Sequence, residues 1–213
     1  MDPGLRELAR RTPGFMPEAE GLALYEAALG VAGQAPLLEI GSYCGLSALY
    51  LGGAARDRDG LLFSVDHHRG SEEHQPGQQY HDPKLAAEDG EVDTLPCFRR
   101  TLGAAGLEGW VVPVVAESAR LASHWRTPLA LVFLDGGHSQ AAADADYAGW
   151  SPWVIVGGLL AIHDVFPDPR DGGRPPFVIY ERALAEGFLE THGCGSLRVL
   201  RRPSPALRRS RRR

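Results

Sequence analysis

The sequence contains little cysteine and no long apolar run. Its three cysteines, Cys44, Cys97 and Cys194, lie far apart and form no CxxC pair, which argues against a disulfide framework and fits a reducing cytoplasm. The longest clean apolar run covers residues 129–134, far fewer than the roughly 20 residues of a membrane span. The charged N-terminus lacks the apolar segment of a signal peptide. We therefore expect a cytoplasmic protein without a membrane span.

Lysine is almost absent, and the arginines are unevenly distributed. Only Lys84 is a lysine; the other 21 of the 22 basic residues are arginines, a bias typical of a GC-rich genome. Seven arginines and no acidic residue lie in residues 201–213, so the net charge of −5 leaves −12 on residues 1–200. An acidic body argues against nucleic-acid binding. We expect the basic tail to be a solvated, disordered terminus, although it could also contact an anionic surface.

Short apolar runs alternate with helix-like stretches along residues 1–200, which we take as one domain. The runs predict strands at 37–41, 61–66, 111–116, 129–135 and 159–163. The other stretches predict two N-terminal helices within residues 1–33, and further helices at 46–55, 91–105, 118–125, 139–150 and 177–187. Two more runs, 188–191 and 197–200, could pair as an antiparallel hairpin. This rhythm predicts an α/β fold with a Rossmann-like, mostly parallel seven-stranded sheet and helices on both faces.

The first predicted strand ends in a glycine-rich turn. Residues 39–45 read EIGSYCG, an E-x-G-x-x-x-G pattern whose glycines allow a sharp turn and a close approach of the backbone to a ligand. Tyr43 distinguishes the turn from the dinucleotide pattern G-x-G-x-x-G, because its bulk would obstruct a pyrophosphate. A cofactor without phosphates fits better. Asp66 ends the second strand, where its carboxylate can accept both hydroxyls of a ribose.

Polar residues also follow the fourth and fifth predicted strands. Asp135 and His138 follow one strand, and His163 and Asp164 follow the next. Because ligands bind beyond the carboxyl ends of parallel strands, these side chains would face one pocket. Two carboxylates and an imidazole there could hold a divalent cation. The alternatives are that Asp135 caps the next helix and that the histidines have structural roles.

These residues resemble the class I S-adenosylmethionine-dependent methyltransferases, and most closely their metal-dependent O-methyltransferases of the macrocin and mycinamicin type. The resemblance covers about residues 30–200. It implies S-adenosylmethionine as cofactor and Mg²⁺, or Mn²⁺, as metal. The family has metal carboxylates where this chain has Asp135, His163 and Asp164, so a histidine stands in the place of one acid. It has a histidine base where this chain has His138.

The resemblance implies particular site residues. The expected cofactor contacts are Glu39, Gly41, Ser42, Tyr43, Gly45, Asp66, His67, Glu117, Ser118 and Asp135. The expected catalytic residues are Asp135 and His138. Methyl transfer from a sulfonium is a direct displacement, so the protein must align the reactants and activate the acceptor hydroxyl. A metal can stabilise the developing alkoxide, and an imidazole can accept the proton.

Residues 67–90 form a long polar segment that interrupts the strand–helix rhythm. A connection of this length is usually functional or disordered, and this one directly follows Asp66. We interpret it as a lid and substrate loop, with acceptor contacts from Arg69, Gln79, Tyr80 and His81. Its polar composition suits a polyhydroxylated small molecule or oligosaccharide better than a flat aromatic acceptor. The alternative is a solvated loop without a ligand.

The function that the sequence predicts is metal-dependent O-methylation of a sugar, polysaccharide or glycosylated metabolite. Actinobacterial enzymes that methylate sugar hydroxyls are the nearest kind. One alternative is a catechol-type O-methyltransferase of an aromatic metabolite. Another is a non-catalytic cofactor-binding module, which the presence of Asp135, His138 and Asp164 disfavours. Related enzymes often dimerise, so a homodimer is also considered.

Overall fold

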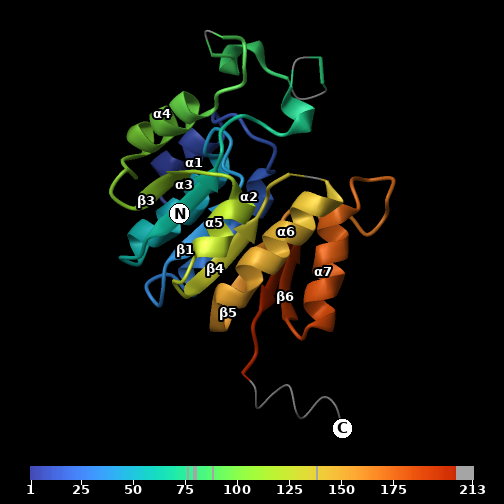
Figure 1. Cartoon of the computed structure of the whole chain (residues 1–213). Coiled ribbons are helices and arrows are strands. Elements are labelled where there is room, and N and C mark those ends of the chain that lie inside the picture. Colours follow the sequence, from blue (N-terminus) through green and yellow to red (C-terminus); the bar gives the residue numbers. More distant parts are fainter. Residues whose placement is uncertain (76, 79–80, 88, 138, 205–213) are drawn as a thin grey trace.

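The computed structural model describes residues 1–75, 77–78, 81–87, 89–137 and 139–204. Within these ranges a seven-stranded sheet forms the centre, in the order β3-β2-β1-β4-β5-β7-β6 (Figure 1). The strands are β1 (Leu37–Ile40), β2 (Leu62–Asp66), β3 (Val111–Val115), β4 (Leu129–Leu134), β5 (Val154–Ile162), β6 (Leu189–Cys194) and β7 (Leu197–Arg201). Strands β1 to β5 are parallel, and β7 is antiparallel to β5 and β6. The predicted fold class is confirmed.

Helices cover both faces of the sheet. They are α1 (Pro3–Ala9), α2 (Glu18–Leu29), α3 (Leu46–Asp57), α4 (Leu95–Ala105), α5 (Ser118–His124), α6 (Gln140–Trp150) and α7 (Pro175–Ala185). Alternate residues of β4 face the two layers: Leu131 and Phe133 pack with α1 to α4, whereas Val132 and Leu134 pack with α5 to α7. A strand buried on both faces reads as a continuous apolar run. Burial of one such side chain contributes about 1.5–3 kcal/mol, so β4 is a firm support for Asp135 at its end.

The starts of two elements, β5 and α4, differ most from the sequence prediction. Strand β5 begins at Val154 rather than at residue 159, because Gly157 adopts a φ of +83° and lets the strand continue past an irregularity in its pairing with β4. Helix α4 begins at Leu95 rather than at residue 91, because a proline in its first turn marks the start. A glycine and a proline therefore set the two boundaries.

The polar segment between β2 and α4 lies above the carboxyl ends of the parallel strands (Figure 1). Its described residues include two short 3₁₀ turns, Glu72–His74 and Pro83–Leu85. The expected contacts Gln79 and Tyr80, and residues 205–213 of the basic tail, lie outside the described residues. None of the helices in the described ranges combines the length and the apolar character of a membrane span.

Candidate functional site

A pocket of about 1250 Å³ opens at the carboxyl ends of the parallel strands. Residues just past β1, β2, β3, β4 and β5 all contribute to its wall, as the topology predicts. The expected site residues that line it are Gly41, Ser42, Tyr43, Asp66, His67, Glu117, Ser118, Asp135, His163 and Asp164. The expected base His138 lies outside the described residues.

The glycine turn and Asp66 form one end of this pocket. Asp66 accepts hydrogen bonds from the backbone N–H groups of Ser42 and Tyr43, both at 2.9 Å, and from that of His68 at 2.8 Å. Burial opposes ionisation of this carboxyl, but the nearby His68 and the three N–H groups outweigh it and lower the pKa of Asp66. Asp66 is therefore a fixed anion that ties the end of β2 to the turn after β1.

Gly41 fits its position for two reasons. Its φ is +84°, and a Cβ there would lie 2.0 Å from the backbone oxygen of Asp135. A side chain would therefore collide with the backbone that follows β4. The turn after β1 and the candidate catalytic segment after β4 are thus in direct contact.

Glu39 occupies a different place from the one expected. The side chain is fully buried and accepts a hydrogen bond from the hydroxyl of Ser64, and it is not among the residues that line the pocket. Burial raises the pKa of Glu39 to about 8. The structure therefore places Glu39 in the core behind the turn. Gly45 also lies outside the pocket lining, against Phe98 of α4.

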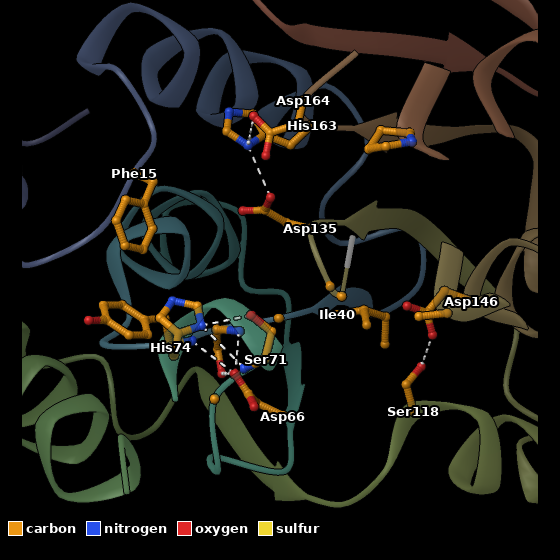
Figure 2. Close-up of a pocket in the computed structure, with 18 of the residues that line it drawn as sticks. Phe15, Ile40, Asp66, Ser71, His74, Ser118, Asp135, Asp146, His163 and Asp164 are labelled. Atoms are coloured by element: carbon orange, nitrogen blue, oxygen red, sulfur yellow. Dashed lines mark hydrogen bonds and ion pairs between the residues drawn. The ribbon is translucent and has the colours of Figure 1, made fainter. Parts of the chain in front are cut away.

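A network of carboxylates surrounds the buried ring of His163 at the opposite end of the pocket (Figure 2). Its Nε2 lies 2.6 Å from Oε2 of Glu20, and its Nδ1 lies 3.0 Å from Oδ1 of Asp135 and 3.4 Å from Oδ1 of Asp164. Glu20, on α2, also accepts a hydrogen bond of 2.7 Å from the backbone N–H of Ser196. The network thus joins the N-terminal helix, the ends of β4 and β5, and the turn between β6 and β7.

His163 is a cation in this network. Burial opposes its charge, but the carboxylates of Asp135, Glu20 and Asp164 outweigh burial and raise the pKa of His163 to about 11. Both ring nitrogens therefore carry protons and donate hydrogen bonds, so the ring has no lone pair for a metal as it stands. In this arrangement the imidazolium holds the carboxylates, and its ligand atom lies within 4.8 Å of those of Asp135 and Asp164, so the expected ligand role of His163 stays a prediction.

Two of the expected acceptor contacts, Arg69 and His81, lie away from the pocket. The chain turns at His68, whose φ is +60°, and buries that ring against Thr94 with a hydrogen bond of 2.7 Å. Arg69 consequently faces solvent, and a ring nitrogen of His81 lies 3.1 Å from the backbone oxygen of His74. Neither Arg69 nor His81 lines the pocket.

Aromatic side chains line the pocket in their place. The rings of Tyr43 and His74 stack with centroids 5.1 Å apart, and the ring of Phe15 lies 5.5 Å from that of Tyr43. Phe15 is 57% exposed, an unusual state for so large an apolar side chain. Phe15 and His74 come from segments far apart in the sequence, and the fold brings their rings together with that of Tyr43.

Sequence reasoning missed two buried acids, Glu20 and Asp146. Glu20 gave no local signal, because its partner His163 is 143 residues away. Asp146 did give one: it lies between Ala143, Tyr147 and Trp150 on the buried face of α6, where a charged residue is unexpected. A charged residue within an apolar stripe could have been singled out as a site candidate.

The comparisons with known proteins agree with this geometry. A family model described as a methyltransferase domain matches residues 38–165. The strand order, with β7 antiparallel to its neighbours, is that of the class I methyltransferase architecture. The chain belongs to this methyltransferase family, and the resemblance to class I S-adenosylmethionine-dependent methyltransferases is confirmed.

Solved structures with the same fold are distant in sequence. The O-methyltransferase TomG from Streptomyces achromogenes, involved in tomaymycin synthesis and solved with SAM, shares 16% identity and a TM-score of 0.62, covering 96% of this chain and 91% of that chain. The SAH-bound methyltransferase PaMTH1 from Podospora anserina shares 14% identity and a TM-score of 0.67, covering 96% and 89%. An O-methyltransferase from Bacillus cereus in complex with SAH shares 17% identity and a TM-score of 0.58, covering 94% and 91%.

Proposed function

We propose that the protein transfers a methyl group from S-adenosylmethionine (SAM) to a hydroxyl group of a sugar or glycosylated metabolite, with a divalent cation at the acceptor end of the pocket. The observation that carries the proposal is the arrangement of a single pocket. A ribose-type carboxylate, Asp66, lies at one end, and a pair of metal-type carboxylates, Asp135 and Asp164, lies at the other.

Several features support SAM as the methyl donor. The family is one of methyltransferases, and TomG and the Bacillus cereus enzyme were solved with SAM and its product S-adenosylhomocysteine (SAH). Tyr43 in the glycine turn disfavours a pyrophosphate, and Asp66 beside the turn suits the two hydroxyls of a ribose. Ser42, His67, Glu117 and the other expected contacts line the same wall.

The acceptor end has the donor atoms that Mg²⁺ or Mn²⁺ would need. Ligand atoms of Asp135, His163 and Asp164 all lie within 4.8 Å of one another. Carboxylate oxygens are the preferred ligands of these hard cations, so Asp135 and Asp164 would hold the ion. A bound ion would lower the pKa of an acceptor hydroxyl. His163 supports this arrangement from behind by fixing Asp135, as partners of metal ligands do.

The acceptor proton needs a base, and the sequence prediction of His138 for that role stays a prediction. To His163 we assign a positioning role rather than that of a base. The imidazolium of His163 is already protonated and bonded on both nitrogens, so its role is to orient Asp135. The cytoplasmic location and the homodimer also stay predictions.

A flat aromatic diol is the second candidate acceptor. The exposed ring of Phe15 and the stacked pair of Tyr43 and His74 favour it, because aromatic rings stack readily on a planar acceptor. The polar residues of the segment after β2 favour the sugar. The two candidates share the metal site and differ only in what lies against the aromatic wall.

The deciding experiment measures SAH formation with methyl glycosides and with catechol as acceptors. Each acceptor is incubated with SAM and the full-length chain in the presence of Mg²⁺, Mn²⁺ or EDTA. The proposal expects transfer to a glycoside that EDTA abolishes. Transfer to catechol alone would select the second candidate. Transfer that EDTA leaves unchanged would contradict the metal role of Asp135 and Asp164.

A further inference from the structure

Asp146 is a buried acidic residue that has no role in the proposed methyl transfer. It lies on α6, and its side chain lines the pocket while the residue as a whole is only 7% exposed. No described basic residue forms an ion pair with it, and burial raises the pKa of Asp146 to about 6. A buried carboxylate without a cation is costly, and such a cost usually persists where the group serves a ligand.

One oxygen of this carboxylate is fixed by a chain of hydrogen bonds. The indole N–H of Trp150 donates to the hydroxyl of Ser118 at 2.8 Å, and that hydroxyl donates its own proton to Oδ1 of Asp146. Trp150 is fully buried, and Ser118 begins α5. Because the direction of each donation is set, the carboxylate is held as an acceptor in one orientation.

The other oxygen faces the pocket. A Cβ at position 136 would lie 2.8 Å from Oδ2 of Asp146, so Gly136 leaves the space beside this oxygen open. No donor to Oδ2 exists among the residues that the structure describes. Figure 2 shows Asp146 with Ser118 on one side of the pocket, apart from the cluster of Asp135 and His163. Oδ2 is therefore an acceptor in need of a donor.

The position of Asp146 suggests which donor it meets. With the ribose at Asp66 and the acceptor end at Asp135, the side of the pocket at Ser118 and Asp146 is left for the base. Ser118 follows β3, and Asp146 lies on the helix after β4. Ile40 and Ala145 add apolar surface to the same pocket, as a flat base requires. The exocyclic amine of adenine is a donor that a carboxylate accepts well.

We infer that Asp146 recognises the exocyclic amine of the cofactor's adenine and thereby selects adenine over its deaminated counterpart. Hypoxanthine presents a carbonyl oxygen at the same position, and two acceptors facing each other cannot form a hydrogen bond. A site built to accept a particular N–H strongly rejects an analogue that lacks it. This inference rests on the proposed cofactor but not on the metal or on the acceptor.

The test compares the binding of SAH and of S-inosylhomocysteine, its deaminated analogue, to the full-length chain by calorimetry. The wild type should bind SAH at least tenfold more tightly. Asp146→Asn should reduce that preference about tenfold or reverse it, because the amide can donate to the carbonyl of hypoxanthine. Asp144→Asn is the matched control: Asp144 lies on the same helix but does not line the pocket, so its substitution should leave the ratio unchanged.

Three outcomes would overturn the inference. An unchanged ratio in Asp146→Asn, with SAH binding intact, removes Asp146 from this role alone. Equal binding of SAH and S-inosylhomocysteine by the wild type also contradicts the inference. This comparison needs no variant, so it is valid even if Asp146→Asn fails to fold. Binding of neither compound by the wild type would defeat the proposed cofactor as well, which separates the two failures.

Discussion

The two ends of the pocket are built in different ways. At the cofactor end, backbone N–H groups of a continuous turn hold Asp66, and the geometry depends on the φ of Gly41. At the acceptor end, side chains from distant elements hold one another: Glu20 contacts His163, which contacts Asp135. The cofactor end is therefore fixed by local backbone geometry, whereas the acceptor end is assembled by the topology of the sheet and the N-terminal helix.

The largest effect is expected from the loss of the Asp135 carboxylate, which should impair the acceptor end of the pocket and spare the cofactor end. Asp135→Asn should lower turnover about a thousandfold, because it weakens the proposed metal site and the partner of His163 together. The Kd for SAH should change less than threefold. Activity assays and calorimetry measure the two quantities. Asp144→Asn on the exposed face of α6 is the control and should match the wild type. Equal losses of turnover and of SAH binding would contradict the division of the pocket.

Substitution at the glycine turn should damage the cofactor end instead. Gly41→Ala places a Cβ 2.0 Å from a backbone oxygen at a φ of +84°. We expect SAH affinity to fall about a hundredfold, because the turn must shift away from Asp66. Gly157→Ala is a matched control, since φ there is +83° but nothing lies within 4 Å of the added carbon. If both variants lose SAH affinity equally, the collision with the residue 135 backbone is not the cause.

Glu20 tests whether a distant helix holds the acceptor end. Glu20→Gln removes the charge behind His163, and we expect turnover to fall about thirtyfold while the Kd for SAH stays unchanged. A buried imidazolium that loses a partner should also destabilise the fold, by about 3 kcal/mol in chemical unfolding. Glu18→Gln, on the same helix but exposed, should leave turnover unchanged. An unaltered turnover in Glu20→Gln would show that Asp135 needs no support from α2.

The same contrast explains what the sequence could and could not predict. Gly41 and Asp66 were predictable because each belongs to a pattern within a strand and its adjoining turn. Asp135 and Asp164 were predictable because neighbouring parallel strands end at one edge of the sheet. The partner of His163 was not predictable, because Glu20 reaches it only through the packing of α2. The stacking of His74 on Tyr43 was not predictable for the same reason.

The smallest effect is expected at Asp146. It tests whether this buried carboxylate lowers the free energy of unfolding of the ligand-free protein. Its pKa is raised from an ordinary 3.8 to about 6, so the folded state binds this proton more tightly than the unfolded state does. The carboxylate therefore costs no stability below pH 3.8, and the penalty develops between pH 4 and pH 6 and is complete above pH 6. Two pKa units correspond to roughly 3 kcal/mol at most.

Asp146→Asn should therefore stabilise the ligand-free protein at pH 8 by about 1 kcal/mol, because the unpaired amide donors of the asparagine offset part of the gain. The gain should shrink as the pH falls through 6 and vanish near pH 4. Urea unfolding of wild type and variant across this range measures it, with Asp144→Asn as a control that should show no such trend. A pH-independent difference would mean that the charge on Asp146 is already compensated in the ligand-free pocket. Buried charge at the cofactor end would then be neutralised, as it is by His163 at the acceptor end.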